Sequence, residues 1–104
     1  MMERIEKLKE FLKANPEDSF LNHALALEYL KLNDAPAARK TFEDLLGRDP
    51  GYVGSYYHLA KILESAGEKD KAIEWYEKGI GVARKAGDQH ALNELQAAHD
   101  DLTE

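Results

Sequence analysis

The side chains best suited to catalysis or metal binding in this sequence are its histidines, because imidazole titrates near neutral pH and ligates zinc. There are four of them, at His23, His58, His90 and His99. No two histidines stand four residues apart on one predicted helix, and only His90 has a carboxylate, Glu94, at that spacing. Histidines scattered along helices usually contact solvent or fill packing space. The spacing therefore predicts neither a metal site nor a cofactor.

A phosphate-binding loop or a catalytic nucleophile would need a sequence context that this chain lacks. Gly79 and Gly81 lie inside a predicted helix with no strand before them, so we interpret the pair as a place of close helix packing. No serine, histidine and aspartate stand in a recognisable triad context, and the chain has no cysteine. The sequence therefore predicts that the protein is not an enzyme.

Length and composition indicate one soluble helical domain. The chain has 104 residues, of which 43% are hydrophobic and 33% are charged, and such values are ordinary for a globular protein. Its 14 Lys and Arg residues are interleaved with 20 Asp and Glu residues, which leaves a formal net charge of −6. Because a negative surface repels phosphate backbones, we expect no nucleic-acid partner.

The N-terminal segment, residues 1–10, alternates acidic and basic side chains where a secretion signal would carry an apolar run. No stretch of the chain approaches the ~20 continuous apolar residues of a membrane span. The absence of cysteine is compatible with a reducing compartment. We therefore expect a cytoplasmic protein with no membrane partner.

The strongest pattern in the chain is an internal repeat over Asn15–Arg84. Pro16 and Pro50 stand 34 residues apart. The same offset relates five further pairs of residues of similar size: Leu25 and Leu59, Ala26 and Ala60, Ala38 and Ala72, Phe42 and Tyr76, and Leu46 and Ile80. A period of about 34 residues is typical of proteins that stack pairs of helices.

The second copy of this repeat resembles a tetratricopeptide repeat (TPR). The aromatic, leucine and small residues of that family recur at Tyr56, Leu59, Ala60, Leu63, Gly67, Ala72 and Tyr76. The resemblance covers Asn15–Arg84. It implies an all-α fold in which antiparallel helix pairs form a short TPR solenoid, a right-handed superhelix.

Apolar spacing and capping residues predict six helices. They are expected at Glu3–Ala14, Ser19–Leu32, a segment capped by Asp34 that ends at Gly47, Val53–Ala66, Lys69–Lys85 and Gln89–Leu102. Asp18, Asp34 and Asp88 are the predicted N-caps. Gly67 is expected to supply the positive φ of a helix exit.

We expect these helices to form a single TPR domain with four segments. These are a half-repeat helix (1–14), a first repeat (15–50), a second repeat (51–86) and a C-terminal capping helix with a polar outer surface (87–104).

The helix Ser19–Leu32 departs from the pattern in two ways. Asn22 stands where the family usually has a large aromatic, and we expect Phe20 and Leu21 to fill that volume. The helix is also apolar nearly all round, because a second apolar row accompanies its core residues. Either neighbouring helices cover this row, or it forms a groove for an apolar partner segment or for a second copy of the protein.

The candidate partner-binding residues lie on the first helix of each pair, about 100° or more around from the stripe that packs inside the repeat. They are Phe20, His23, Leu27, Leu30, Tyr57, Lys61 and Glu64. An apolar partner side chain would enter near Leu27 and Leu30. Tyr57 would stack or donate a hydrogen bond, while Lys61 and Glu64 would set the direction of the partner at the rim.

The function implied by the resemblance is that of a noncatalytic protein–protein interaction module, an adaptor that presents a concave groove to a peptide or helix. TPR proteins that grip the C-terminal carboxylate of chaperones use a clamp of Lys, Asn and Arg side chains. The corresponding positions here offer one cation, Lys61. That partner class is therefore not expected, and the partner is a protein or peptide whose identity stays open.

The alternative is a structural homo-oligomer, most simply a homodimer, in which the apolar face of Ser19–Leu32 is buried against another copy. Two repeats are fewer than the ~3 that a stable solenoid usually needs. The flanking helices and a dimer contact are both able to supply the missing burial.

Overall fold

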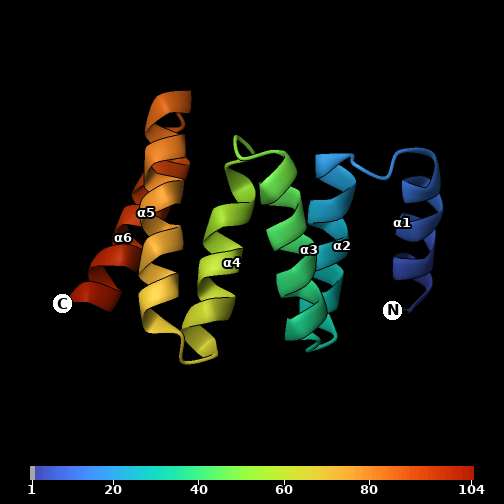
Figure 1. Cartoon of the computed structure of the whole chain (residues 1–104), viewed down its shortest axis with the longest axis horizontal. Coiled ribbons are helices and arrows are strands. Elements are labelled where there is room, and N and C mark those ends of the chain that lie inside the picture. The colour runs from blue at the N-terminus through green and yellow to red at the C-terminus, as the bar shows by residue number, and fades with distance from the viewer. Residues whose placement is uncertain (1) are drawn as a thin grey trace. The chain divides into compact units, whose positions relative to one another are not determined.

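Six α-helices make up the part of the chain that the computed structural model describes, residues 2–104 (Figure 1). Their bounds are α1 Met2–Ala14, α2 Ser19–Lys31, α3 Ala35–Arg48, α4 Gly54–Ser65, α5 Lys69–Ala86 and α6 Gln89–Thr103. No strand occurs among these residues. The predicted all-α fold is therefore confirmed, and the predicted helix ends are correct to within about one residue, the precision that end fraying allows.

The ends of the helices follow from their capping residues. The side chains of Asp18, Asp34 and Asp88 each accept a hydrogen bond from the backbone N–H three residues later, at 2.8, 3.2 and 3.0 Å. Each bond satisfies one of the first-turn N–H groups that have no partner inside the helix. Gly67 and Gly87 adopt φ values of 80° and 71° at two helix exits, which glycine tolerates without a steric penalty.

Contacts within the chain divide it into two units, Met1–Asp49 and Pro50–Glu104. In the first unit α1 packs on α2, and α2 packs on α3. Ile5, Leu8 and Leu25 form the buried centre of the contact between α1 and α2. The finer division into a half-repeat, two repeats and a capping helix stays a prediction.

A buried carboxylate also ties α1 to α2. Glu28 of α2 lies 3.2 Å from the Arg4 Nε of α1 and 3.0 Å from the Lys31 Nζ one helical turn later. The hydrogen bond from Lys31 is the main cause that holds the pKa of Glu28 below its ordinary value, with burial acting in the opposite direction. Glu28 therefore stays ionised and paired in this otherwise apolar contact.

Small residues allow the helices of each pair to approach closely. In the first unit Ala26 of α2, Ala38 of α3 and Phe42 of α3 are fully buried. The residues 34 positions later in the second unit are also fully buried, namely Ala60, Ala72 and Tyr76. Equivalent positions thus have equivalent environments, and the predicted repeat register is confirmed.

Asn22 makes the hydrogen bond that an aromatic makes in the second unit. Its Nδ2 donates to the backbone oxygens of Pro16 at 3.1 Å and Asp18 at 2.9 Å. In the second unit the hydroxyl of Tyr56 donates to the backbone oxygen of Pro50. Both donors reach the carbonyl of the proline that begins the repeat. The amide of Asn22 therefore makes the hydrogen bond that the phenol of Tyr56 makes in the second unit.

The expectation that Phe20 fills the missing aromatic volume is wrong. Phe20 is 69% exposed, whereas Leu21 packs against the Ile5, Leu8 and Leu25 cluster. Successive residues of a helix point about 100° apart, so Phe20 and Leu21 do not project in the direction of Asn22.

Gly79 lies at a point of very close packing in the second unit. A Cβ atom at this position would stand 2.7 Å from the Cβ of Tyr56 and 3.1 Å from the Cδ1 of Leu95. The predicted close approach is therefore confirmed at Gly79. The same prediction is wrong for Gly81, where a Cβ would meet nothing within 4 Å.

Two pairs of equivalent positions differ in side-chain size in opposite directions between the two units. The first unit has a small Asn22 and a large Leu45, whereas the second unit has a large Tyr56 and, in place of the leucine, Gly79. Tyr56 approaches Gly79 so closely that position 79 has no room for a side chain in the second unit. Close-packed interiors keep total volume nearly constant in this way.

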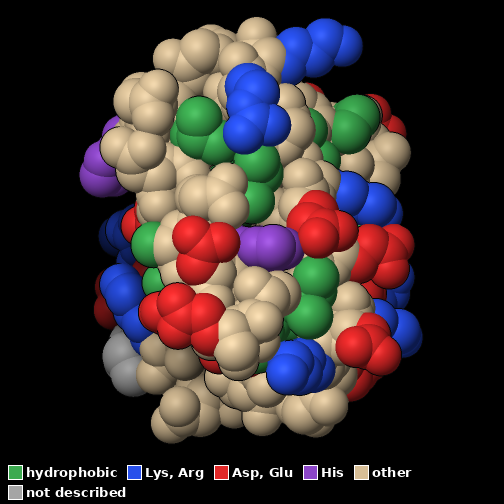
Figure 2. All heavy atoms as spheres, turned by 90° about the vertical axis from the view of Figure 1, so that its left-hand side faces the viewer, with side chains coloured by type: hydrophobic (Ala, Val, Ile, Leu, Met, Phe, Trp, Pro, Cys, Tyr) green, Lys and Arg blue, Asp and Glu red, His purple; other side chains and the backbone are tan. Residues whose placement is uncertain are grey.

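The last helix covers the apolar side of α5. Leu95 and Ala98 of α6 are buried, and α6 also contacts α4. The surface seen from the side of α5 and α6 carries charged and histidine side chains, with hydrophobic side chains in small separate patches (Figure 2). This arrangement agrees with a helix that buries one face and presents a polar one.

Candidate functional site

The three predicted partner-binding residues of α4 lie together. Tyr57, Lys61 and Glu64 have the i, i+4, i+7 spacing of one helix face, and all three are half-buried. The Lys61 Nζ lies 5.7 Å from the centroid of the Tyr57 ring and 3.7 Å from the Glu64 Oε1. An aromatic ring, a cation and an anion therefore form one contiguous surface within the second unit.

A fourth residue, the buried Tyr76 of α5, holds Glu64 of this surface by a hydrogen bond. Its hydroxyl donates a hydrogen bond to the Glu64 Oε1 at 2.8 Å, and its ring is fully buried. Burial, followed by the hydrogen bond to the Glu64 carboxylate, raises the pKa of the Tyr76 phenol well above its ordinary value. Tyr76 therefore remains a protonated donor that fixes the position of Glu64.

Sequence reasoning missed this role of Tyr76. The 34-residue offset equates Tyr76 with Phe42, so it predicts a core aromatic and says nothing about the hydroxyl. The change from phenylalanine to tyrosine was the available signal, because a buried phenol needs a hydrogen-bond acceptor.

The predicted residues of α2 belong to the first unit and have mixed environments. Phe20 is largely exposed, whereas Leu27 and Leu30 are half-buried. The ring of His23 meets the ring of Phe42 edge-on, with 5.6 Å between the centroids. Phe20 and Leu27 therefore remain accessible, while His23 also takes part in packing between α2 and α3.

Two of the histidines, His58 and His99, interact with carboxylates that are distant in the sequence. The His99 Nε2 of α6 lies 3.0 Å from the Glu77 Oε2 of α5. Burial lowers the pKa of the His58 imidazole, and the Glu94 carboxylate opposes that effect. His90 and Glu94, which stand four residues apart on α6, are both exposed.

Residues 2–104 contain neither a metal-binding cluster nor a membrane-spanning helix. No group of three or more His, Cys, Asp or Glu side chains is placed to hold a metal ion there. None of the helices in that part of the chain combines the length and the apolar character needed to cross a membrane.

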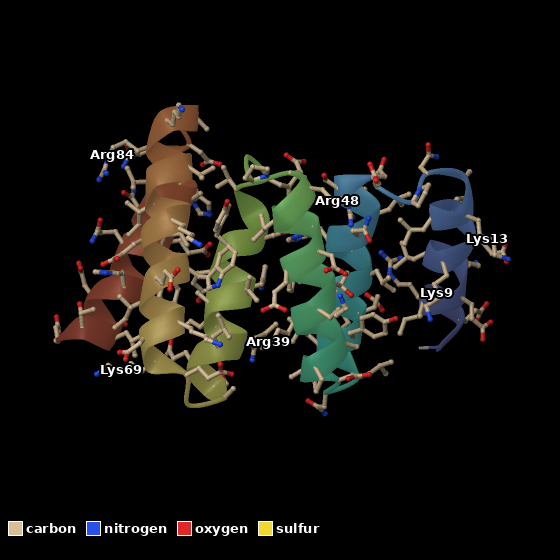
Figure 3. All side chains as sticks on the ribbon, viewed as in Figure 1. Lys9, Lys13, Arg39, Arg48, Lys69 and Arg84 are labelled. Atoms are coloured by element: carbon tan, nitrogen blue, oxygen red, sulfur yellow. The ribbon has the colours of Figure 1, made fainter. Side chains whose placement is uncertain are left out.

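Basic side chains are dispersed along the described helices. Lys9 and Lys13 project from α1, while Lys69 and Arg84 project from the two ends of α5 (Figure 3). Several such residues pair with an acid one turn away on the same helix, as Lys13 does with Glu10 at 2.9 Å. This dispersal differs from the clustered basic face that a phosphate backbone requires.

Known proteins share this arrangement of helices and its sequence pattern. A family model described as tetratricopeptide repeat matches residues 23–91. Hsp70-Hsp90 organizing protein 3 of Arabidopsis thaliana is 31% identical over 78 residues, which cover 75% of this chain and 14% of that protein. The chain spans between 14% and 26% of the length of the curated relatives it matches.

Solved structures extend the likeness to three dimensions. The tetratricopeptide repeat domain protein of Salinibacter ruber is 47% identical, with a TM-score of 0.80 over 82% of this chain and 94% of that one. The TPR2B domain of yeast Sti1, in a complex with pHsp70, has a TM-score of 0.87 over 95% of this chain and 79% of that one. Its identity of 19% shows a shared fold alone. Together with the family model, which matches more than half of the residues, these likenesses show that the chain belongs to the tetratricopeptide repeat family.

Proposed function

We propose that this chain is a noncatalytic protein-interaction module, an adaptor that binds a peptide or helix of another protein on an exposed face of α4 in the second unit, and that α2 of the first unit offers a face of its own. The α4 face carries this proposal. Tyr57, Lys61 and Glu64 stay accessible there, while Leu59 and Leu63 on the same helix are fully buried. An aromatic ring with charges of both signs at its edge suits a peptide-binding surface, in which a ring supplies contact area and the charges give orientation.

Relatives of the same fold support a protein or peptide ligand. The TPR2B domain of yeast Sti1 was solved in a complex with pHsp70, and the Arabidopsis relative is named an Hsp70-Hsp90 organizing protein. The α4 face of this chain does not suit an acidic C-terminal ligand. Its α4 contains one lysine, Lys61, and no arginine, which is too few cations for a carboxylate clamp.

The α2 face is proposed to bind apolar side chains. Phe20, Leu27 and Leu30 present an aromatic and two aliphatic side chains on one helix, with His23 between them. Such side chains suit the apolar positions of a peptide or of an amphipathic helix.

The test compares the native protein with a double variant, Leu27→Glu and Tyr57→Glu, as bait in extracts of the source cell. Introducing a carboxylate on each face is expected to abolish capture of the specific partners, because burial of an unpaired charge opposes association. The control is Ala97→Glu, which adds a charge at an exposed position of α6. Circular dichroism must show native helicity for all proteins, and recovery of the same partners by the folded double variant would contradict the proposed surface.

A second candidate is self-association, as a homodimer or larger homo-oligomer. Phe11 of α1 and Phe20 of α2 are 61% and 69% exposed, and both belong to the first unit. Large apolar side chains exposed to this degree favour burial against another molecule.

Sedimentation equilibrium distinguishes this candidate from a free binding face. If the protein is a homodimer, it is expected to dimerise at low micromolar concentration, and Phe20→Lys is expected to weaken that association at least tenfold. Ala14→Lys, which adds the same single positive charge at an exposed position of α1, serves as the control. If the protein is a monomer at every concentration, the homo-oligomer hypothesis is wrong.

A further inference from the structure

The Glu64 carboxylate is held from one side and open on the other. Its Oε1 accepts the hydrogen bond from Tyr76 and is also the oxygen nearest to Lys61. Within residues 2–104 both of these contacts are made by Oε1 and none by Oε2, and the side chain is 34% exposed. Because a buried donor already fixes this anion, binding a cation there requires little further ordering.

The ring of Tyr57 lies on the same face of α4 as the Glu64 carboxylate, on the other side of Lys61. A cation already lies beside it, since the Lys61 Nζ is 5.7 Å from the ring centroid. A cation near an aromatic ring gains electrostatic stabilisation from the negative face of the ring. A positively charged group that entered from solvent would therefore meet a ring and a carboxylate together.

The charge around α4 in the second unit also favours a cation. The neighbouring α6 contacts α4. It carries Glu94, Asp100 and Asp101 and contains neither lysine nor arginine. The other helix packed on α4, α5, carries five basic and three acidic side chains, but residues 50–104 as a whole hold ten Asp and Glu against six Lys and Arg. An acidic surround raises the local concentration of positively charged ligands and disfavours acidic ones.

We infer that the α4 face binds a lysine or arginine side chain of its peptide or helix partner, with Glu64 as the acceptor and Tyr57 as the aromatic wall. The inference rests on the proposed function and names the chemistry of its ligand. It distinguishes this surface from one that would receive an acidic segment or a terminal carboxylate.

Lys61 then acts as a resident competitor. Its side chain is 44% exposed, and its ion pair with Glu64 is long at 3.7 Å, so the pair is weak and easily exchanged. An incoming guanidinium forms two parallel hydrogen bonds with a carboxylate, which an ammonium cannot do. The partner's cation is therefore expected to displace Lys61 toward solvent.

The experiment begins with selection of peptides from a random dodecapeptide library displayed on phage, with the full chain as bait. Enriched peptides are expected to share a lysine or arginine at one position. The probe is then the most enriched peptide, synthesised with a fluorophore, and its Kd is measured by fluorescence anisotropy. Glu64→Gln is expected to weaken binding about tenfold, whereas Lys61→Gln is expected to strengthen it, because it removes the competitor.

Matched controls distinguish an effect of the local site from the effect of a change in the net charge of the protein. Glu74→Gln and Lys71→Gln make the same two charge changes at exposed positions of α5, about 200° and 140° around that helix from Tyr76. Both are expected to change the Kd less than twofold. A probe whose basic residue is replaced by glutamine must bind the native protein and the Glu64→Gln variant equally, which assigns the effect to that one pair.

The outcomes distinguish the inference from the function on which it rests. Peptides that bind through the α4 face without a basic residue, or an equal effect of Glu64→Gln and Glu74→Gln, overturn the inference and leave the interaction module standing. A library that yields no peptide sensitive to Tyr57→Glu contradicts the proposed function, and the inference then fails with it. Glu64→Gln retains an oxygen for Tyr76, so native helicity is expected and is checked by circular dichroism.

Discussion

Gly79→Leu is expected to destabilise the second unit by roughly 3 kcal/mol, because it forces a branched side chain into occupied space. Even a single Cβ at this position would stand 2.7 Å from the Cβ of Tyr56 and 3.1 Å from the Cδ1 of Leu95. Neither neighbour has room to move aside, since both are buried. Urea denaturation followed by circular dichroism measures the loss in the free energy of unfolding.

The first unit suggests how this damage is compensated. There the equivalent positions hold Asn22 and Leu45, so Tyr56→Asn combined with Gly79→Leu installs the same pair in the second unit. We expect the double variant to be at least about 1 kcal/mol more stable than the sum of the two single changes predicts. The new asparagine can also donate to the Pro50 carbonyl, as Asn22 does to its own proline.

The control for this cycle is Gly81→Leu. It makes the same substitution two residues later in α5, where a Cβ would meet nothing within 4 Å. No loss of stability is expected there, because leucine favours a helix more than glycine does. Strictly additive effects of Tyr56→Asn and Gly79→Leu would show that the two positions do not share volume.

Removal of α6 is expected to abolish cooperative unfolding of the second unit and to leave a helical, loosely packed or aggregating product. Deletion of residues 88–104 removes Leu95 and Ala98, which are buried, and uncovers the apolar side of α5. It also removes the pairing of His99 with Glu77. Exposed apolar surface of this kind promotes association. Thermal melting and sedimentation velocity report the two effects.

A point variant tests whether the buried side chain of Leu95 accounts for the stabilisation by α6. Leu95→Asp keeps the full length of the chain but places a charge at a position that is 1% exposed, and we expect it to reproduce much of the destabilisation. Ala97→Asp introduces the same side chain at an exposed position of α6 and is expected to have little effect. A truncated chain that stays monomeric and melts cooperatively at an unchanged temperature would refute the stabilising role of α6.

The sequence by itself determined the features that depend on residues close together in the chain. Helix ends follow from caps such as Asp18 and Asp34, which act on N–H groups three residues away. The core positions follow from a period of 34 residues, because equivalent pairs such as Phe42 and Tyr76 occupy equivalent buried places. The repeat fold was predictable for this reason. The spacing also placed Tyr57, Lys61 and Glu64 on one face of α4 correctly.

Only the tertiary structure decided which side chains of different helices meet. The bond from Tyr76 to Glu64 and the pairing of His99 with Glu77 each join two helices. Helical periodicity gives the direction of a side chain on its own helix but not the distance, rotation and rise between two helices. Those quantities decide whether a hydroxyl reaches a carboxylate.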